Sequence, residues 1–67
     1  MGKSVIDVCV LKKRRKSLKL TQEELAKKVG VSRQAINKIE RRREMPSIVV
    51  LAKMLKVLDL KFEDVIQ

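Results

Sequence analysis

Residues 21–40, TQEELAKKVGVSRQAINKIE, carry the clearest structural signals in the chain. Thr21 is followed three residues later by Glu24, which is the spacing of a capping box at the start of a helix. Apolar side chains then recur at helical spacing as far as Gly30, where the left-handed conformation that ends a helix costs least. Ser32 caps the next helix. Two helices joined by so short a turn must cross steeply.

The second of these helices, expected over residues 33–41, has two contrasting sides. At about 100° per residue, one side carries Ala35, Ile36 and Ile39 with Glu40 at its edge. The other side carries only hydrogen-bonding groups, which either form an ordinary solvated surface or read bases. Arg can bond guanine and Gln or Asn can bond adenine in a major groove. The predicted base-reading residues are Arg33, Gln34, Asn37 and Lys38.

The residues before this stretch predict another helix. It begins near Ser4 or Asp7 and ends at about residue 17, and a basic run covers most of its surface. Its inward side is expected to carry Val8, Leu11, Arg15 and Leu18. Cys9 lies in an apolar run, where a free thiol is most often a small buried side chain, so we expect it in the core.

The residues after the stretch predict two more helices. One begins after Pro46 with Ser47 as its cap, and the last is expected near residues 62–66. The longer helix is expected to turn Ile48, Leu51, Leu55 and Leu58 inward. A second apolar stripe on this helix, with a spacing of three and four residues, consists of Val50, Met54 and Val57. The last helix either covers this stripe or leaves it for a partner.

Composition limits the function. The chain has 67 residues, enough for a single small domain over residues 1–67, and the helical periodicity predicts an all-α fold. It has no His and one Cys, which disfavours metal sites and thiol enzymes, and no apolar run approaches the length of a membrane span. A cytoplasmic, non-enzymatic protein without a metal, cofactor or evident small-molecule ligand is expected.

Charge suggests the partner. The net charge is +9, and residues 1–46 carry the whole excess, whereas residues 47–67 are neutral. A basic half facing a polyanion and a neutral half supplying core or partner contacts fit this division.

Residues 11–66 closely resemble the Cro/cI (XRE-like) phage-repressor helix-turn-helix family. The resemblance is carried by Gln22, Ala26, the turn Gly30-Val31-Ser32, Ile36 and Glu40, with Pro46-Ser47 and the ending LDLKFEDVI. It implies a compact five-helix lambda-repressor-like DNA-binding domain. Ala26, Gly30, Ser32 and Ile36 would then hold the angle between the two helices of the motif, because a larger side chain at Ala26 would push them apart.

The resemblance also implies residue roles outside the reading helix. Gln22, near free N–H groups and the positive end of a helix dipole, would clamp a DNA phosphate. Arg15 and Glu40 would form a partly buried ion pair. The family commonly has Gly where this chain has Arg42, so either Arg42 adopts a left-handed conformation or the helix continues. In either case Arg41, Arg42 and Arg43 stand beside the groove, so phosphate contacts are expected from them, with ordinary solvated side chains as the alternative.

The favoured function is a sequence-specific double-stranded DNA-binding transcriptional regulator, a repressor that binds an inverted repeat as a homodimer. Short members of the family usually pair through their C-terminal half, which assigns the interface here to the stripe of Val50, Met54 and Val57. One alternative is the DNA-binding antitoxin of a toxin-antitoxin pair, with a protein partner. Another is a non-specific nucleic-acid binder that uses only its charge.

Overall fold

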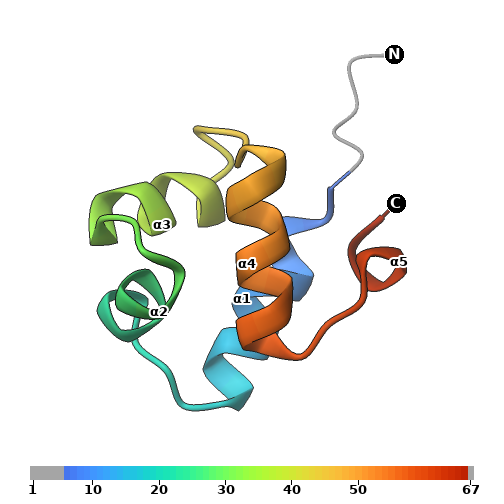
Figure 1. Cartoon of the computed structure of the whole chain (residues 1–67), viewed down its shortest axis with the longest axis horizontal. Coiled ribbons are helices and arrows are strands. Elements are labelled where there is room, and N and C mark those ends of the chain that lie inside the picture. The colour runs from blue at the N-terminus through green and yellow to red at the C-terminus, as the bar shows by residue number, and fades with distance from the viewer. Residues whose placement is uncertain (1–5, 67) are drawn as a thin grey trace.

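Helices begin in the structure at the capping residues that the sequence indicates. The structure is a computed structural model, in which residues 6–66 are described. These residues form five helices and no strand beyond one isolated bridge, which confirms the all-α fold. In chain order they are α1 (Val8–Ser17), α2 (Gln22–Val29), α3 (Arg33–Glu40), α4 (Ile48–Leu58) and α5 (Phe62–Val65). In Figure 1, α4 lies in the centre, α2 and α3 on one side of it and α5 on the other.

Local hydrogen bonds set the ends of α2 and α3. The Thr21 hydroxyl accepts from the backbone N–H of Glu24 at 3.0 Å, and the Glu24 carboxylate accepts from the Thr21 N–H at 2.8 Å. Gly30 ends α2 with φ at +89°, and the Ser32 hydroxyl accepts from the N–H of Ala35 at 3.1 Å. The capping box, the left-handed glycine and the second cap are all as predicted, and together they form the helix-turn-helix.

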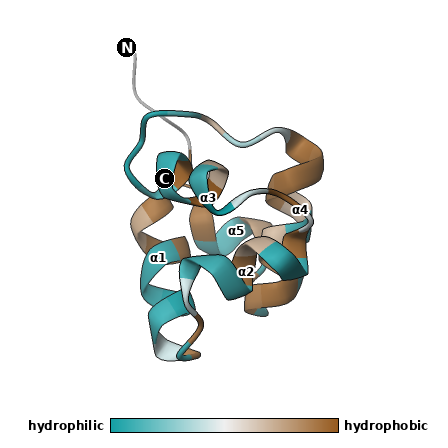
Figure 2. Ribbon diagram, turned by 90° about the vertical axis from the view of Figure 1, so that its left-hand side faces the viewer, coloured by the Kyte–Doolittle hydropathy of each residue, from teal (hydrophilic) through white to brown (hydrophobic). Residues whose placement is uncertain are grey.

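The core joins all five helices. Each helix contributes to the fully buried side chains, which are Leu11, Leu25, Ile36, Met54, Leu58 and Val65. Within the core, α2 packs against α3 and α4, while α1 packs against α3, α4 and α5. Ala26 is buried in α2, as expected for the position where the motif helices cross. Figure 2 shows that α4 is the most hydrophobic helix and that α1 and α2 present hydrophilic surfaces.

The two ends of the described chain are tied together. Ile6 and Ile66 form an antiparallel bridge, and the Asp7 N–H donates to the Val65 carbonyl at 2.6 Å. Asp7 also caps α1, because its carboxylate accepts from the Cys9 N–H at 3.0 Å. The start at Asp7 is thus observed, whereas the other candidate start, Ser4, lies outside the described residues.

Two expectations for α1 are wrong. Cys9 is exposed instead of packed in the core, because a helical turn of 100° per residue moves it away from the side that buries Val8 and Leu11. Leu18 is 43% exposed, because α1 ends at Ser17 and Leu18 leaves the helical path.

Two further corrections concern α4. Ile48, expected to point inward, is 71% exposed, whereas Met54, expected on an outer stripe, is fully buried. The core side of α4 is centred on Leu51 and Leu58, and Met54 lies on the flank that α2 covers. Ile48 lies on the opposite flank of α4, in its first turn.

The turn between α2 and α3 yields the first prediction. A Cβ at Gly30 would meet no atom within 4 Å, so the cost of Gly30→Ala is only that of a left-handed backbone. That cost is about 1–2 kcal/mol of unfolding free energy, and Gly30→Asn should lose less because Asn tolerates this conformation better. Urea unfolding followed by circular dichroism measures both variants. Equal stability of the Ala variant and the wild type would contradict this account of the turn.

Candidate nucleic-acid interface

Helix α3 presents a polar side to solvent and an apolar side to the core. Arg33, Gln34 and Lys38 are exposed, and Asn37 is half-buried. On the opposite side Ile36 and Ile39 are buried, and Ala35 is half-buried. The placement of the candidate base-reading residues therefore agrees with the sequence pattern, with Asn37 the least accessible of the four.

A buried ion pair anchors the end of α3 to α1. Arg15 Nε donates to Glu40 Oε2 at 2.7 Å, and Arg15 Nη2 donates to Glu40 Oε1 at 3.1 Å. Both residues are only 7% exposed. The third nitrogen, Arg15 Nη1, donates to the Leu20 carbonyl at 2.7 Å, so the guanidinium also holds the segment that leads into α2. The ion pair expected between these positions is present, and its geometry is the strong bidentate form.

Gln22 extends this pair into a network across three helices. Its Nε2 donates to Glu40 Oε1 at 3.0 Å, and its Oε1 accepts from Asn37 Nδ2 at 3.4 Å. No buried side-chain nitrogen or oxygen among the described residues lacks a hydrogen-bond partner. Arg15, Glu40, Gln22 and Asn37, together called the anchor network below, thus fix α1, α2 and α3 relative to one another.

The sequence did not reveal the Gln22 contacts. The sequence predicts only a phosphate contact for Gln22, yet both ends of its amide are engaged inside the protein, with Glu40 and Asn37 as partners. Gln22 lies 15 positions before Asn37 and 18 positions before Glu40 in the sequence. No periodicity or spacing in the sequence indicates such pairs. Gln22 remains a predicted phosphate ligand through its second amide hydrogen and its place at the start of α2.

The arginines after α3 form a separate group. The helix ends at Glu40, and Arg42 adopts a left-handed conformation with φ at +60°, so the first of the two expected alternatives holds. The backbone N–H of Arg43 returns to the Lys38 carbonyl at 2.8 Å and closes the helix end. Such a conformation costs roughly 1–2 kcal/mol in a residue with a Cβ. All three side chains of Arg41, Arg42 and Arg43 are exposed, as phosphate ligands need to be.

The three residues expected at a dimer interface do not form one exposed stripe. Met54 is fully buried in the core of the chain itself, so it cannot contact a partner. Val50 and Val57 are half-buried and pack against the same core. The apolar side chains that α4 and the chain after it expose are different ones, namely Ile48, Val49, Phe62 and Ile66.

Comparison with known proteins now settles the family. A helix-turn-helix family model of the XRE type matches residues 11–65. The chain belongs to this helix-turn-helix family. It is also similar to three archaeal proteins, each described as an uncharacterized HTH-type transcriptional regulator.

The relatives cover most of this helix-turn-helix protein. The protein of Methanocaldococcus jannaschii is 50% identical over 46 residues, which is 69% of this chain and 70% of the relative. That of Methanothermobacter thermautotrophicus is 43% identical over 49 residues, 73% of this chain and 71% of its own. That of Archaeoglobus fulgidus is 40% identical over 55 residues, 82% of this chain and 78% of its own. DNA binding in transcription regulation is the function of the family.

Two other classes of feature are missing from the described part of this helix-turn-helix protein. None of its helices in residues 6–66 has the length and hydropathy to cross a membrane. The same residues contain no cluster of three or more side chains able to hold a metal ion.

The anchor network yields the second prediction. Glu40→Gln should lower the unfolding free energy by about 3–5 kcal/mol, because it leaves the Arg15 guanidinium buried without its counter-charge. For a domain of this size the thermal midpoint should fall by about 15 °C or more. Glu44→Gln, which removes the same charge from an exposed position nearby, is the matched control and should change little. A Glu40 variant as stable as the control would show that the pair does not hold the fold.

Proposed function

We propose that this protein is a sequence-specific double-stranded DNA-binding regulator that acts as a repressor without a cofactor or enzymatic activity. On this proposal the 67 residues are one cytoplasmic DNA-binding unit. Helix α3 enters the major groove, where Arg33 and Gln34 read base edges from its first turn. Asn37 and Lys38 contact bases or phosphates one turn later, and the phosphates on either side are bound by Gln22 and by Arg41, Arg42 and Arg43.

The observation that carries the proposal is the fixed presentation of α3. The anchor network holds both the start of α2 and the end of α3, while Arg33, Gln34 and Lys38 stay exposed on the free side. Specific readout needs such side chains on a rigid element, because each base-edge bond contributes only in a narrow geometry.

Two alternatives predict different behaviour. A non-specific charge-driven binder needs no ordered base-reading side chains, and the fixed geometry of α3 weighs against it. An antitoxin would use the same DNA-binding surface and in addition a toxin partner. Selection from a random duplex library tests specificity directly: enrichment of one sequence supports the proposal, and the absence of any enrichment refutes it.

The base-reading assignment gives a paired prediction on the selected duplex. Gln34→Ala should cost about 1–3 kcal/mol of binding free energy and relax the preference at one base pair, because it removes base-edge bonds. Arg43→Ala should weaken binding to all sequences alike, because it removes one phosphate contact. The slope of log binding constant against log salt concentration should become less negative by about 0.9. Fluorescence anisotropy across a salt series measures both. The same uniform loss in the two variants would contradict the division of roles.

We also propose a homodimer, with an interface different from the stripe of Val50, Met54 and Val57 that the sequence predicts. Val57 borders a hollow with four lysines, so pairing there would bring like charges together. The exposed Ile48, Val49, Phe62 and Ile66 lie in the part of the chain without net charge. A twofold pair would place two α3 helices about 34 Å apart and would require an inverted-repeat site.

Sedimentation equilibrium at micromolar concentration tests the dimer. The wild type should show twice the monomer mass, and Ile48→Asp should give the monomer, because a buried unpaired charge opposes association. Leu18→Asp makes the same change at an exposed apolar residue at the end of α1 and should remain dimeric. A monomeric wild type that binds one half-site with full affinity would refute the dimer.

A further inference from the structure

A hollow lined by lysines lies between the end of α2 and the side of α4. Its volume is about 520 Å³. Lys27 and Lys28 border it from the last turn of α2, and Lys53 and Lys56 border it from α4. Val29 and Val57 supply apolar lining. We call this feature the lysine hollow.

The charge of the lysine hollow is not neutralised by the protein. All four lysines are exposed, and the single ion pair among the described residues, Arg15 with Glu40, involves none of them. Of the carboxylates close to these lysines in sequence, Glu24 is engaged with the Thr21 backbone, and neither Glu23 nor Asp59 forms an ion pair with them. The hollow therefore presents four free ammonium groups from two helices, a pattern that attracts a polyanion.

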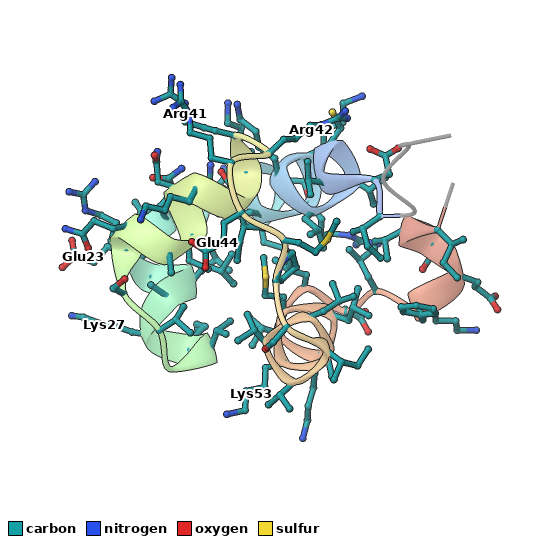
Figure 3. All side chains as sticks on the ribbon, turned by 90° about the horizontal axis from the view of Figure 1, so that it is seen from above. Glu23, Lys27, Arg41, Arg42, Glu44 and Lys53 are labelled. Carbon is teal, nitrogen blue, oxygen red and sulfur yellow. The ribbon has the colours of Figure 1, made fainter. Side chains whose placement is uncertain are left out.

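The lysine hollow and the arginines after α3 lie on different sides of the molecule. Figure 3 shows Lys27 and Lys53 on one side of the molecule, and Arg41 and Arg42 on the opposite side. On the proposed binding mode, the duplex lies along α3 and these arginines, on the side away from Lys27 and Lys53. The charge of the hollow thus serves no contact in the proposed complex with a single duplex.

We propose that the lysine hollow binds the sugar–phosphate backbone of a second DNA segment, so that the protein joins two duplexes. The inference rests on the proposed DNA-binding function. Lysine binds phosphate as a point charge, without the planar geometry that suits Arg to carboxylates and base edges. The four basic groups of the hollow are all Lys, whereas four of the five basic residues in 33–43 are Arg. The hollow therefore suits contact with a backbone of any sequence.

A duplex is favoured over an acidic protein segment by concentration. A molecule already bound to DNA through α3 meets other segments of that DNA at a high effective concentration. A backbone strand can lie in the hollow between the two lysine pairs, beside the half-buried Val57, while the buried Val29 forms part of the floor.

A capture assay tests the proposal. A duplex of about 30 base pairs, roughly three helical turns, is immobilised, loaded with protein and washed, and a fluorescent second duplex is then added. One variant replaces Lys27, Lys28, Lys53 and Lys56 with Gln. The matched control replaces Lys12, Lys13, Lys16 and Lys19 with Gln, so each variant has a net charge of +5 in place of +9. Gln is nearly as good a helix former as Lys, and thermal melting verifies that both variants fold.

The wild type and the control should capture the second duplex, and the hollow variant should capture it at least about tenfold less well. Binding of the hollow variant to the first duplex should change by no more than about twofold, because the α3 surface is intact. The logarithm of the binding constant for the second duplex should fall with the logarithm of the salt concentration with a slope no steeper than about −3.6, the value for four phosphates.

Three results would overturn the inference. An equal loss of second-duplex capture in the hollow variant and the control would show that the net charge alone captures DNA. Undiminished capture by the hollow variant would show that a dimer joins two duplexes through its two α3 helices. Binding of labelled polyglutamate to the loaded wild type, dependent on the four lysines and without capture of DNA, would assign the hollow to acidic proteins. Failure of the wild type to bind the first duplex would instead refute the proposed function.

Discussion

The bidentate pair of Arg15 and Glu40 is the interaction on which the rest of the structure depends. The Glu40 carboxylate at the end of α3 is bound by the Arg15 guanidinium from α1, and that guanidinium also donates to the carbonyl of Leu20, two residues before α2. Burial removes water from both charges at a cost in free energy, so each must form its full set of hydrogen bonds within the protein. Gln22 and Leu20 complete that set, so three elements become one rigid support for the exposed side of α3.

Rigidity of this kind links packing to recognition. The α2–α3 motif is short, and its turn is held only by the left-handed Gly30 and the Ser32 cap, so further contacts are needed to fix α3. Ile36 and Ile39 hold one side of α3 in the hydrophobic core, and the anchor network holds the C-terminal end of α3 against α1. The remaining side chains of α3 are free to meet DNA in a constant geometry.

Local signals in the sequence predicted most of the fold. Thr21, Gly30 and Ser32 act through bonds and conformations within a few residues, so they could be recognised without the fold. Ile48 and Met54 could not, because both lie beside the same apolar stripe of α4, and only the positions of α2 and α5 decide which flank is covered. The Gln22 contacts and the lysine hollow were missed for a related reason. They join residues far apart in sequence, and their spacing leaves no pattern to read.

The most direct test of the account is the map of backbone amide shifts by nuclear magnetic resonance when one equivalent of the selected duplex is added. The account predicts the largest changes at Arg33, Gln34 and Lys38, with further changes at residues 41–43 and at the start of α2. Amides of Leu51 and Leu58 in α4 should change little. Changes concentrated on α4 and α5, with α3 unaltered, would contradict the claim that the anchored α3 is the surface that reads DNA.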